Sequence, residues 1–179
     1  MSEPAPMAEA FRYCPACRHP NPEPGVIPFR CAKCSFTFFF GPVAAVGGLI
    51  INSRGRLLLV RRSRDPGAGK WGLPGGFVDR NETIESALHR EIMEETGLKV
   101  TRQTLLTTGP NSYTYQGVTA DVVDLFYVCR VASTRSIQLA ADELSEYRWC
   151  IPGKDELDDM AFPSNRMAVR VWLDRRRSQ

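Results

Sequence analysis

The sequence predicts a mixed fold of the α/β (α+β) class, with a small cysteine-rich module in front of the main domain. Strand-like apolar runs occur at residues 43–51 and 120–133, and an amphipathic helix begins between them at Ile84. Two Cys-x2-Cys pairs lie near the N-terminus. Helices that interrupt a series of strands are typical of a mixed sheet in an α/β or α+β domain.

The composition bounds the class of protein. The 179 residues are 43% apolar and 24% charged, which suffices for the core of one domain with a small appendage. The net charge of +3 is too small to indicate a nucleic-acid surface, so nucleic acid is not an expected partner. No apolar run reaches the roughly 18 residues of a membrane span, and the first residues lack the pattern of a signal peptide. We therefore predict a cytoplasmic protein that does not bind membranes.

The four N-terminal cysteines predict a zinc site. The pairs are Cys14 with Cys17 and Cys31 with Cys34. A two-residue gap lets one tight turn direct both thiolates at one ion, and four thiolates close the coordination sphere, so the Zn²⁺ would be structural. The alternatives are two disulfides or a redox-active pair, which are uncommon in a cytoplasmic chain without a surrounding βαβ pattern. His19 is expected to be a loop residue.

These landmarks divide the chain into three parts. Residues 1–10, rich in Pro, Ala and Glu, are predicted to be a disordered tail. Residues 11–40 form the predicted zinc ribbon, which is too small to hold a core without its metal. Residues 41–179 form the main domain.

The expected elements follow from apolar periodicity and turn residues. A strand over 36–40 precedes one over 43–51, which a turn at 52–55 joins to a strand over 56–62 as a hairpin. A Gly- and Pro-rich loop over 63–76 and the helix from Ile84 follow. Strands are expected over 100–109 and 120–133, with a turn-prone segment at 111–117 between them, and over 146–152. The last element is a helix over 162–177, and Arg175–Arg177 at its C-terminal end interact favourably with the helix macrodipole.

The helix from Ile84 has well-marked ends. Thr83 is the expected N-cap, and Gly97 is the expected left-handed C-cap. With about 100° of rotation per residue, Ile84, Leu88 and Ile92 define a buried apolar stripe.

Three glutamates of this helix, Glu91, Glu94 and Glu95, lie on an arc of roughly 100° that overlaps the apolar stripe. A helix that needs only solubility carries its acids opposite its apolar face, and like charges three or four residues apart repel. The arc therefore predicts a bound cation, and clustered oxygen ligands favour Mg²⁺ or Mn²⁺ shared with substrate phosphates. The alternative is the solvated acidic end of a surface helix.

The spacing Gly76-x5-Glu82-x7-Arg90-Glu91-Ile92-x-Glu94-Glu95-x-Gly97-Leu98 resembles the Nudix box, the signature of the Nudix hydrolases, with every defined position filled. The preceding segment, Trp71-Gly-Leu-Pro-Gly75, is similar to the family's entry into the box, and the likeness covers about residues 42–175. The resemblance implies an α/β/α sandwich around a mixed sheet, and metal-dependent hydrolysis of a nucleoside diphosphate linked to another group.

The resemblance also implies roles for the residues of the box. The glutamates of the arc, Glu91, Glu94 and Glu95, would bind Mg²⁺ or Mn²⁺ with the carbonyl of Gly75. Glu82 and Arg90 would form a structural salt bridge.

The general base in this family is a box glutamate or an acid on a later loop. The candidates on such a loop are Asp142, Glu143 and Glu146, of which we choose Glu143. The alternative for each is an exposed loop acid.

Three further side chains are candidates for substrate contact. Arg61, which with Arg62 ends the strand over 56–62, is placed to reach a phosphate, and Tyr113 and Tyr115 could stack on a base. The alternatives are a solvated strand end for the arginine and ordinary packing for the tyrosines.

The order of the modules narrows the substrate. A zinc ribbon ahead of a Nudix domain resembles the arrangement in NADH pyrophosphatases and in relatives that act on ADP-ribose or FAD. The SQPWPFPxS-like motif of the NADH group is missing from residues 99–117. We therefore expect a small nucleotide substrate such as ADP-ribose, FAD, NADH or a similar compound. The alternatives are an RNA-end or cap-directed hydrolase and a non-catalytic ligand sensor, and the resemblance also allows a homodimer.

Overall fold

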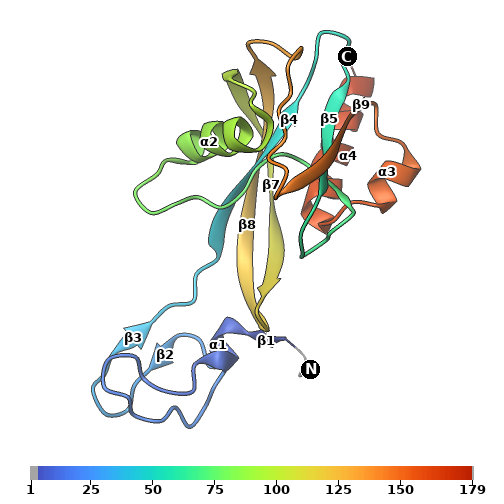
Figure 1. Ribbon diagram of the computed structural model, residues 1–179. Coiled ribbons are helices and arrows are strands. Elements are labelled where there is room, and N and C mark those ends of the chain that lie inside the picture. Colours follow the sequence, from blue (N-terminus) through green and yellow to red (C-terminus); the bar gives the residue numbers. More distant parts are fainter. Residues whose placement is uncertain (1–3, 179) are drawn as a thin grey trace. The chain divides into compact units, whose positions relative to one another are not determined.

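The computed structural model describes residues 4–178 and shows the mixed fold that the sequence predicts. Two compact units make up the chain: unit 1 contains the described residues up to Val43 together with Ser112–Val122, and unit 2 contains Ala44–Asn111 and the described residues from Val123 onward. The elements, in chain order (Figure 1), are β1 (Ala5–Pro6), α1 (Met7–Ala10), β2 (Phe29–Arg30), β3 (Thr37–Phe38), β4 (Val43–Ile50), β5 (Leu57–Arg62), β6 (Trp71–Gly72), α2 (Ile84–Thr96), β7 (Val100–Tyr115), β8 (Val118–Val131), β9 (Leu144–Cys150), α3 (Lys154–Asp158) and α4 (Pro163–Arg177).

The strands of unit 2 are divided between two sheets. This arrangement differs from the hairpin that the sequence predicts for residues 43–62. Strand β8 pairs with both β4 and β7, whereas β5 lies between β6 and β9 and is antiparallel to both. A turn joins β4 to β5, but in the part of the chain that the structure describes the two strands are linked only next to this turn, by an isolated bridge between Ile51 and Leu57. The hairpin prediction is wrong because each strand finds its partner far away in sequence: β4 pairs with β8 and β5 with β9.

Helices cover both faces of these strands, so unit 2 is an α/β/α sandwich (Figure 1). Successive side chains of a strand point to opposite faces. Leu58 and Val60 of β5 accordingly join a core with α2, and Leu57 and Leu59 join a second core with α4. The helical residues are Ala87, Leu88 and Ile92 in the first core and Ala168, Val169 and Trp172 in the second.

The two long helices begin and end close to where the sequence predicts. The hydroxyl of Thr83 accepts a hydrogen bond of 3.1 Å from the backbone N–H of Ser86 and so caps α2. Gly97 ends this helix in the left-handed conformation with φ 70°. Helix α4 begins with Pro163 at its first turn.

The turn predicted at 111–117 is much shorter in the structure. Strand β7 runs to Tyr115 and β8 starts at Val118, so the turn consists of Gln116 and Gly117 alone. Both have positive φ, 50° and 79°, as the tight two-residue hairpin turn requires. The alternating Tyr and Thr residues before the turn favour a strand, which explains the difference.

Unit 1 has more structure at its start than the sequence predicts. Residues 5–10, assigned to a disordered tail, form β1 and α1, because Ala5 pairs in parallel with Val118 and Ala8 is buried. Residues 1–3 of that predicted tail lie outside the described residues.

The cysteine-rich part of unit 1 has a small core of its own. Strands β2 and β3 pair antiparallel, and β3 is shorter than the predicted strand over 36–40. Cys14, Phe29 and Cys31 are buried, and the aromatic rings of Phe11 and Phe40 pack beside them.

Within residues 4–178 there is no helix long and apolar enough to cross a membrane.

Candidate active site and cysteine cluster

The segment of residues 74–76 lies close to β4. The backbone N–H of Val46 donates to the carbonyl of Gly76 at 2.9 Å, and that of Gly48 donates to the carbonyl of Pro74 at 2.8 Å. Between them, Gly75 has φ 146°, and a Cβ there would lie 2.0 Å from the carbonyl oxygen of Val46. Only glycine fits this approach. The carbonyls on either side of Gly75, those of Pro74 and Gly76, are thus the ones that accept hydrogen bonds from β4.

Glu95 is the buried acid of the site. It is 6% exposed and its Oε2 accepts a hydrogen bond of 2.9 Å from the backbone N–H of Gly75. Burial, opposed by the hydrogen bond from the Gly75 N–H and aided by the charges of Glu91 and Glu143, raises the pKa of Glu95 to about 8. A negative charge at Glu95 therefore needs a cation beside it.

The carboxylate of Glu91 packs against Gly76. A Cβ on Gly76 would come within 2.6 Å of the Glu91 carboxyl carbon, so the missing side chain makes room for this carboxylate. Burial raises the pKa of Glu91, Arg90 opposes this through a hydrogen bond of 2.8 Å, and the charges of Glu94 and Glu143 raise it further.

Glu94 differs from the other two acids in its exposure. Its side chain is 61% exposed and one oxygen contacts Arg90 at 3.2 Å. Because Arg90 holds Glu94 and Glu91 while Glu95 turns to Gly75, the three carboxylates are not gathered around one point. Among the described residues, the four N-terminal cysteines are the group of potential metal ligands whose atoms lie within 4.8 Å of one another.

Arg90 ties the helix to the loop before it. Its Nε and Nη2 donate to the two oxygens of Glu82 at 3.0 and 2.9 Å. Nη2 also donates to the carbonyl of Phe77, and the backbone N–H of Asp79 donates to Glu82. These hydrogen bonds lower the pKa of Glu82 and raise that of Arg90, so both groups are charged.

Two of the candidate bases, Glu143 and Glu146, differ in their neighbours, and Glu146 lies in β9 and not on the expected loop. The charge of Glu143 acts on both Glu91 and Glu95, so this is the loop acid that faces the acids of α2. Arg64 contacts the Glu143 carboxylate at 2.6 Å. Glu146 instead accepts from Nε of Arg61 at 3.0 Å.

Arg61 and Arg62 end β5 and have different partners, and the register with β9 shifts between the two residues. Arg61 donates to Glu146 and to the carbonyl of Gly69, and its guanidinium lies 4.2 Å from the ring centroid of Trp71. Arg62 lowers the pKa of Glu95, so its charge acts on the most buried acid of the group. The sequence reasoning preferred Arg61, and the two-residue period of β5 could not have selected Arg62 because the pairing with β9 shifts its register between the two arginines.

Tyr113 and Tyr115 belong to unit 1, whereas the acids of α2 belong to unit 2. Tyr115 is 63% exposed. Between the two tyrosines, the hydroxyl of Thr114 hydrogen-bonds to that of Thr119 across the hairpin.

Sequence reasoning missed a buried acid on β8. Asp124 is 7% exposed, and burial raises its pKa while Ser164 and Asn111 beside it lower it in part. The signal was a single acid inside the apolar run Val122-Val-Asp-Leu-Phe126.

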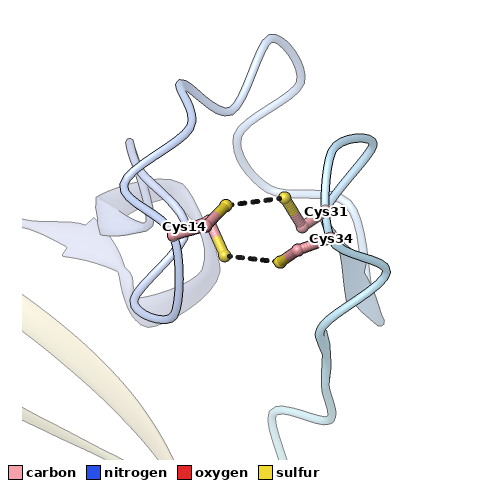
Figure 2. Close-up of side chains that lie close together, drawn as sticks. Cys14, Cys31 and Cys34 are labelled. Atoms are coloured by element: carbon pink, nitrogen blue, oxygen red, sulfur yellow. Dashed lines mark hydrogen bonds between the residues drawn. The ribbon is translucent and has the colours of Figure 1, made fainter.

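The four N-terminal cysteines meet in one cluster (Figure 2). The sulfur atoms of Cys14 and Cys34 are 3.7 Å apart, and those of Cys17 and Cys31 are 3.6 Å apart. A tetrahedral zinc ion with ~2.3 Å bonds separates its sulfur ligands by ~3.8 Å, whereas a disulfide requires ~2.0 Å. The distances fit a shared metal ion.

The same thiols differ in their pKa values. The backbone N–H of Cys34 lowers the pKa of Cys31 to about 6, although burial opposes it. The backbone near His19 lowers the pKa of Cys17, but burial and the other three thiols outweigh it and raise that pKa to about 12. Cys31 therefore ionises before Cys17.

Comparison with known proteins identifies the family. Residues 41–168 match the NUDIX domain. The chain therefore belongs to the NUDIX family, the Nudix hydrolases.

Relatives within this family carry different names. A MutT-like protein of Streptomyces ambofaciens is 32% identical over 115 residues, which are 64% of this chain and 66% of the relative. An ADP-ribose pyrophosphatase of Methanocaldococcus jannaschii is 46% identical over 63 residues, 35% of this chain and 37% of the relative. An RNA pyrophosphohydrolase of Novosphingobium aromaticivorans is 29% identical over 144 residues, 72% of this chain and 88% of the relative. The chain thus spans just under two thirds of the first relative and about a third of the second.

Solved structures agree with the fold. A MutT NUDIX hydrolase from Burkholderia pseudomallei matches with a TM-score of 0.58 and 34% identity over 73% of this chain and 97% of that chain. A NUDIX hydrolase from Nitrosomonas europaea matches with a TM-score of 0.69 over 93% of both chains, at 22% identity. The second likeness shows the fold alone.

Proposed function

We propose that the protein is a pyrophosphohydrolase that uses Mg²⁺ or Mn²⁺ to cleave the diphosphate of a nucleoside diphosphate derivative, with ADP-ribose as the first candidate. The observation that carries this proposal is the electrostatics of α2. Burial already raises the pKa of Glu91 and Glu95, and neighbouring acids raise both further. Such a group favours a cation, which a diphosphate substrate can share.

The donor set fits a hard cation. Glu91, Glu94 and Glu95 offer carboxylate oxygens, and the Glu95 hydrogen bond holds Gly75, whose carbonyl would be a further ligand, next to this helix. Bound there, the ion would neutralise the non-bridging phosphate oxygens and lower the pKa of a water molecule. Glu94 is exposed and held by one contact, so its carboxylate can turn toward such an ion.

Other residues of the chain would handle the proton and the substrate. Glu143 faces Glu91 and Glu95 and would accept the proton of the attacking water. Arg62, whose charge acts on Glu95, would help to hold a phosphate. Arg61, Tyr113 and Tyr115 stay predicted substrate contacts on the sequence pattern.

A substrate panel tests the proposal. Purified protein with Mg²⁺ or Mn²⁺ is incubated with ADP-ribose, FAD and NADH, and a phosphatase then releases phosphate from the monophosphate products. Cleavage of ADP-ribose to AMP and ribose 5-phosphate supports the proposal if it requires the metal and is lost in Glu94→Gln. Folded protein that binds these compounds but cleaves none of them would indicate a ligand sensor.

A second candidate is hydrolysis at the 5′ end of RNA. The observation in its favour is the match to an RNA pyrophosphohydrolase over 88% of that relative. The same panel decides between the two when RNA with a 5′-triphosphate is added: faster pyrophosphate release from RNA than AMP formation from ADP-ribose would select this candidate.

We further propose that the four N-terminal cysteines hold a structural Zn²⁺. Sulfur spacings of 3.7 and 3.6 Å support four-thiolate coordination. A cytoplasmic location agrees with such a site, because free thiols persist in a reducing compartment.

A further inference from the structure

A cleft of about 390 Å³ lies at the end of α4 in unit 2. Its floor is apolar and includes Ile51, Leu106 and Trp172, which are 7%, 6% and 8% exposed. Its remaining lining includes three arginines, Arg130 of β8 and Arg175 and Arg176 of α4. This volume lies within the range of about 300–1,000 Å³ that small-molecule sites occupy.

The cleft does not belong to the candidate active site. The floor residues Ile51, Leu106 and Trp172 are part of the core that α4 covers. The helix that carries the acids packs on the opposite face through Leu88 and Ile92. A ligand in the cleft and a ligand at the acids would therefore occupy different faces of unit 2.

The three guanidinium groups are held in place by the backbone around the cleft. Arg175 donates to the carbonyl of Leu106 at 3.0 Å, and Arg130 donates to the carbonyl of Ile51 at 3.4 Å. Arg176 donates to the carbonyl of Gly55. A guanidinium has five N–H donors, so each arginine keeps donors for a ligand.

In the described part of the chain, these three arginines form no ion pair. Within residues 4–178, none of the three arginines has an acidic oxygen within 4 Å, whereas the adjacent Arg177 contacts Asp174 at 3.9 Å. The helix macrodipole explains a preference for cations at the end of α4, but it does not act on Arg130, which comes from a strand. Three fixed like charges around one cavity favour an anion between them.

We propose that this cleft binds a small organophosphate with an apolar body, of the size and chemistry of a nucleoside monophosphate. Planar guanidinium groups bind phosphate oxygens in pairs, and the three arginines supply such donors from two elements. The apolar floor with the indole of Trp172 provides burial for the base and sugar, which inorganic phosphate could not use. The proposal is independent of the activity of the acidic site.

Titration calorimetry with AMP, adenosine and inorganic phosphate tests the site in the full-length protein. No Mg²⁺ or Mn²⁺ is added, so that the acids of α2 lack the cation that they would share with a phosphate under the proposed function. We expect AMP to bind and the dissociation constants of adenosine and inorganic phosphate to be at least about tenfold higher. Adenosine lacks the phosphate that contacts the arginines, and inorganic phosphate lacks the base and sugar that contact the apolar floor. The indole N–H resonance of Trp172, assigned by its loss in Trp172→Phe, should shift with AMP.

Matched arginine variants locate the binding. Arg130→Gln and Arg175→Gln should each raise the dissociation constant of AMP by about tenfold or more. Arg177→Gln removes the same charge from the same helix end outside the cleft, and should leave that constant within about twofold. Thermal denaturation verifies that each variant is folded.

Three outcomes would overturn the proposal. These are equal affinity for AMP and inorganic phosphate, an equal loss of affinity in Arg177→Gln and Arg175→Gln, and a Trp172 resonance that does not move at saturating AMP.

Discussion

Glu95 of α2 accepts a hydrogen bond of 2.9 Å from the backbone N–H of Gly75, and this contact joins the helix to the glycine loop at a side chain that is only 6% exposed. The loop and the helix are thus fixed relative to each other at the most buried acid of the site.

The stability of the protein without Mg²⁺ should fall as the pH rises. Glu95 has a usual pKa of 4.5 and a pKa of about 8 in the folded protein, so the folded state binds more protons between these values. The free energy of unfolding therefore decreases with rising pH across that window. Urea unfolding at several pH values should show a smaller decrease in Glu95→Gln, and added Mg²⁺ should stabilise the wild type more at pH 8 than at pH 6. Identical pH profiles for wild type and variant would contradict the assignment.

Removal of one acid from α2 should abolish most of the activity. Glu94→Gln is expected to lower turnover on the order of 10³-fold, because the ion at the diphosphate loses a charged ligand, while the melting temperature changes little. Glu85→Gln is the matched control, since Glu85 is an exposed acid in the first turn of the same helix. Similar turnover in both variants would exclude the acidic group as the catalytic site.

The ion pair between Glu82 and Arg90 should stabilise the loop before the helix. Arg90→Gln removes charged hydrogen bonds to Glu82, Glu91 and Glu94 and should lower the free energy of unfolding by about 1.5–3 kcal/mol. Turnover should also fall because the loop and Glu91 lose their fixed position. Arg80→Gln changes an exposed arginine of the same loop and should stay within about 0.5 kcal/mol of the wild type. Equal stability of the two variants would show that the pair contributes nothing.

Two glycines of the loop should respond differently to a methyl group. In Gly76→Ala the new Cβ would meet the carboxylate of Glu91, so turnover should fall roughly tenfold or more while the protein stays folded. In Gly75→Ala the Cβ would meet the backbone carbonyl of Val46 at 2.0 Å, and the protein should unfold at a much lower temperature. Gly41→Ala, where a Cβ meets nothing within 4 Å, is the control for both measurements. A fully active Gly76→Ala would contradict the close packing of Glu91 on this glycine.

Zinc should stabilise the cysteine cluster and leave unit 2 folded. The purified protein is expected to contain one zinc ion per chain by mass spectrometry of the native state, and Cys14→Ser should lose it. Chelation should expose the cluster region to protease, while the thermal transition of unit 2 remains, because the two cores of that unit contain none of these cysteines. Cys150→Ser is the control and should keep the metal. Loss of the whole transition on chelation would show that unit 2 depends on zinc.

Much of the candidate site could be predicted because it depends on local sequence. The ends of α2 follow from Thr83 and Gly97, and the positions of its glutamates follow from helical geometry alone. Helical geometry could not show that Glu95 is buried while Glu94 is 61% exposed. That difference arises where the glycine loop meets α2, and the loop is set by its pairing with β4.

The parts that could not be predicted depend on contacts between distant segments. The sequence around 52–55 predicts a tight turn that reverses the chain direction, and the structure has this turn. The expected hairpin is absent because β5 pairs with β9 instead of β4. The same pairing places Arg61 next to Glu146, whereas the sequence had suggested a free arginine for phosphate. Residues 5–10 form structure because the tip of a hairpin more than 100 residues later provides a strand edge for them.

The contacts of Arg90 also bear on how a cation could replace it beside Glu94. Its two hydrogen bonds to Glu82 and its contact with Glu94 come from different nitrogens. When Glu94 leaves for an incoming cation, the loop anchor at Glu82 stays intact. The guanidinium of Arg90 is thus the counter-ion of Glu91 and Glu94 in this structure, and the exposed Glu94 side chain is free to rotate away from it while the Glu82 contacts keep the loop backbone in place.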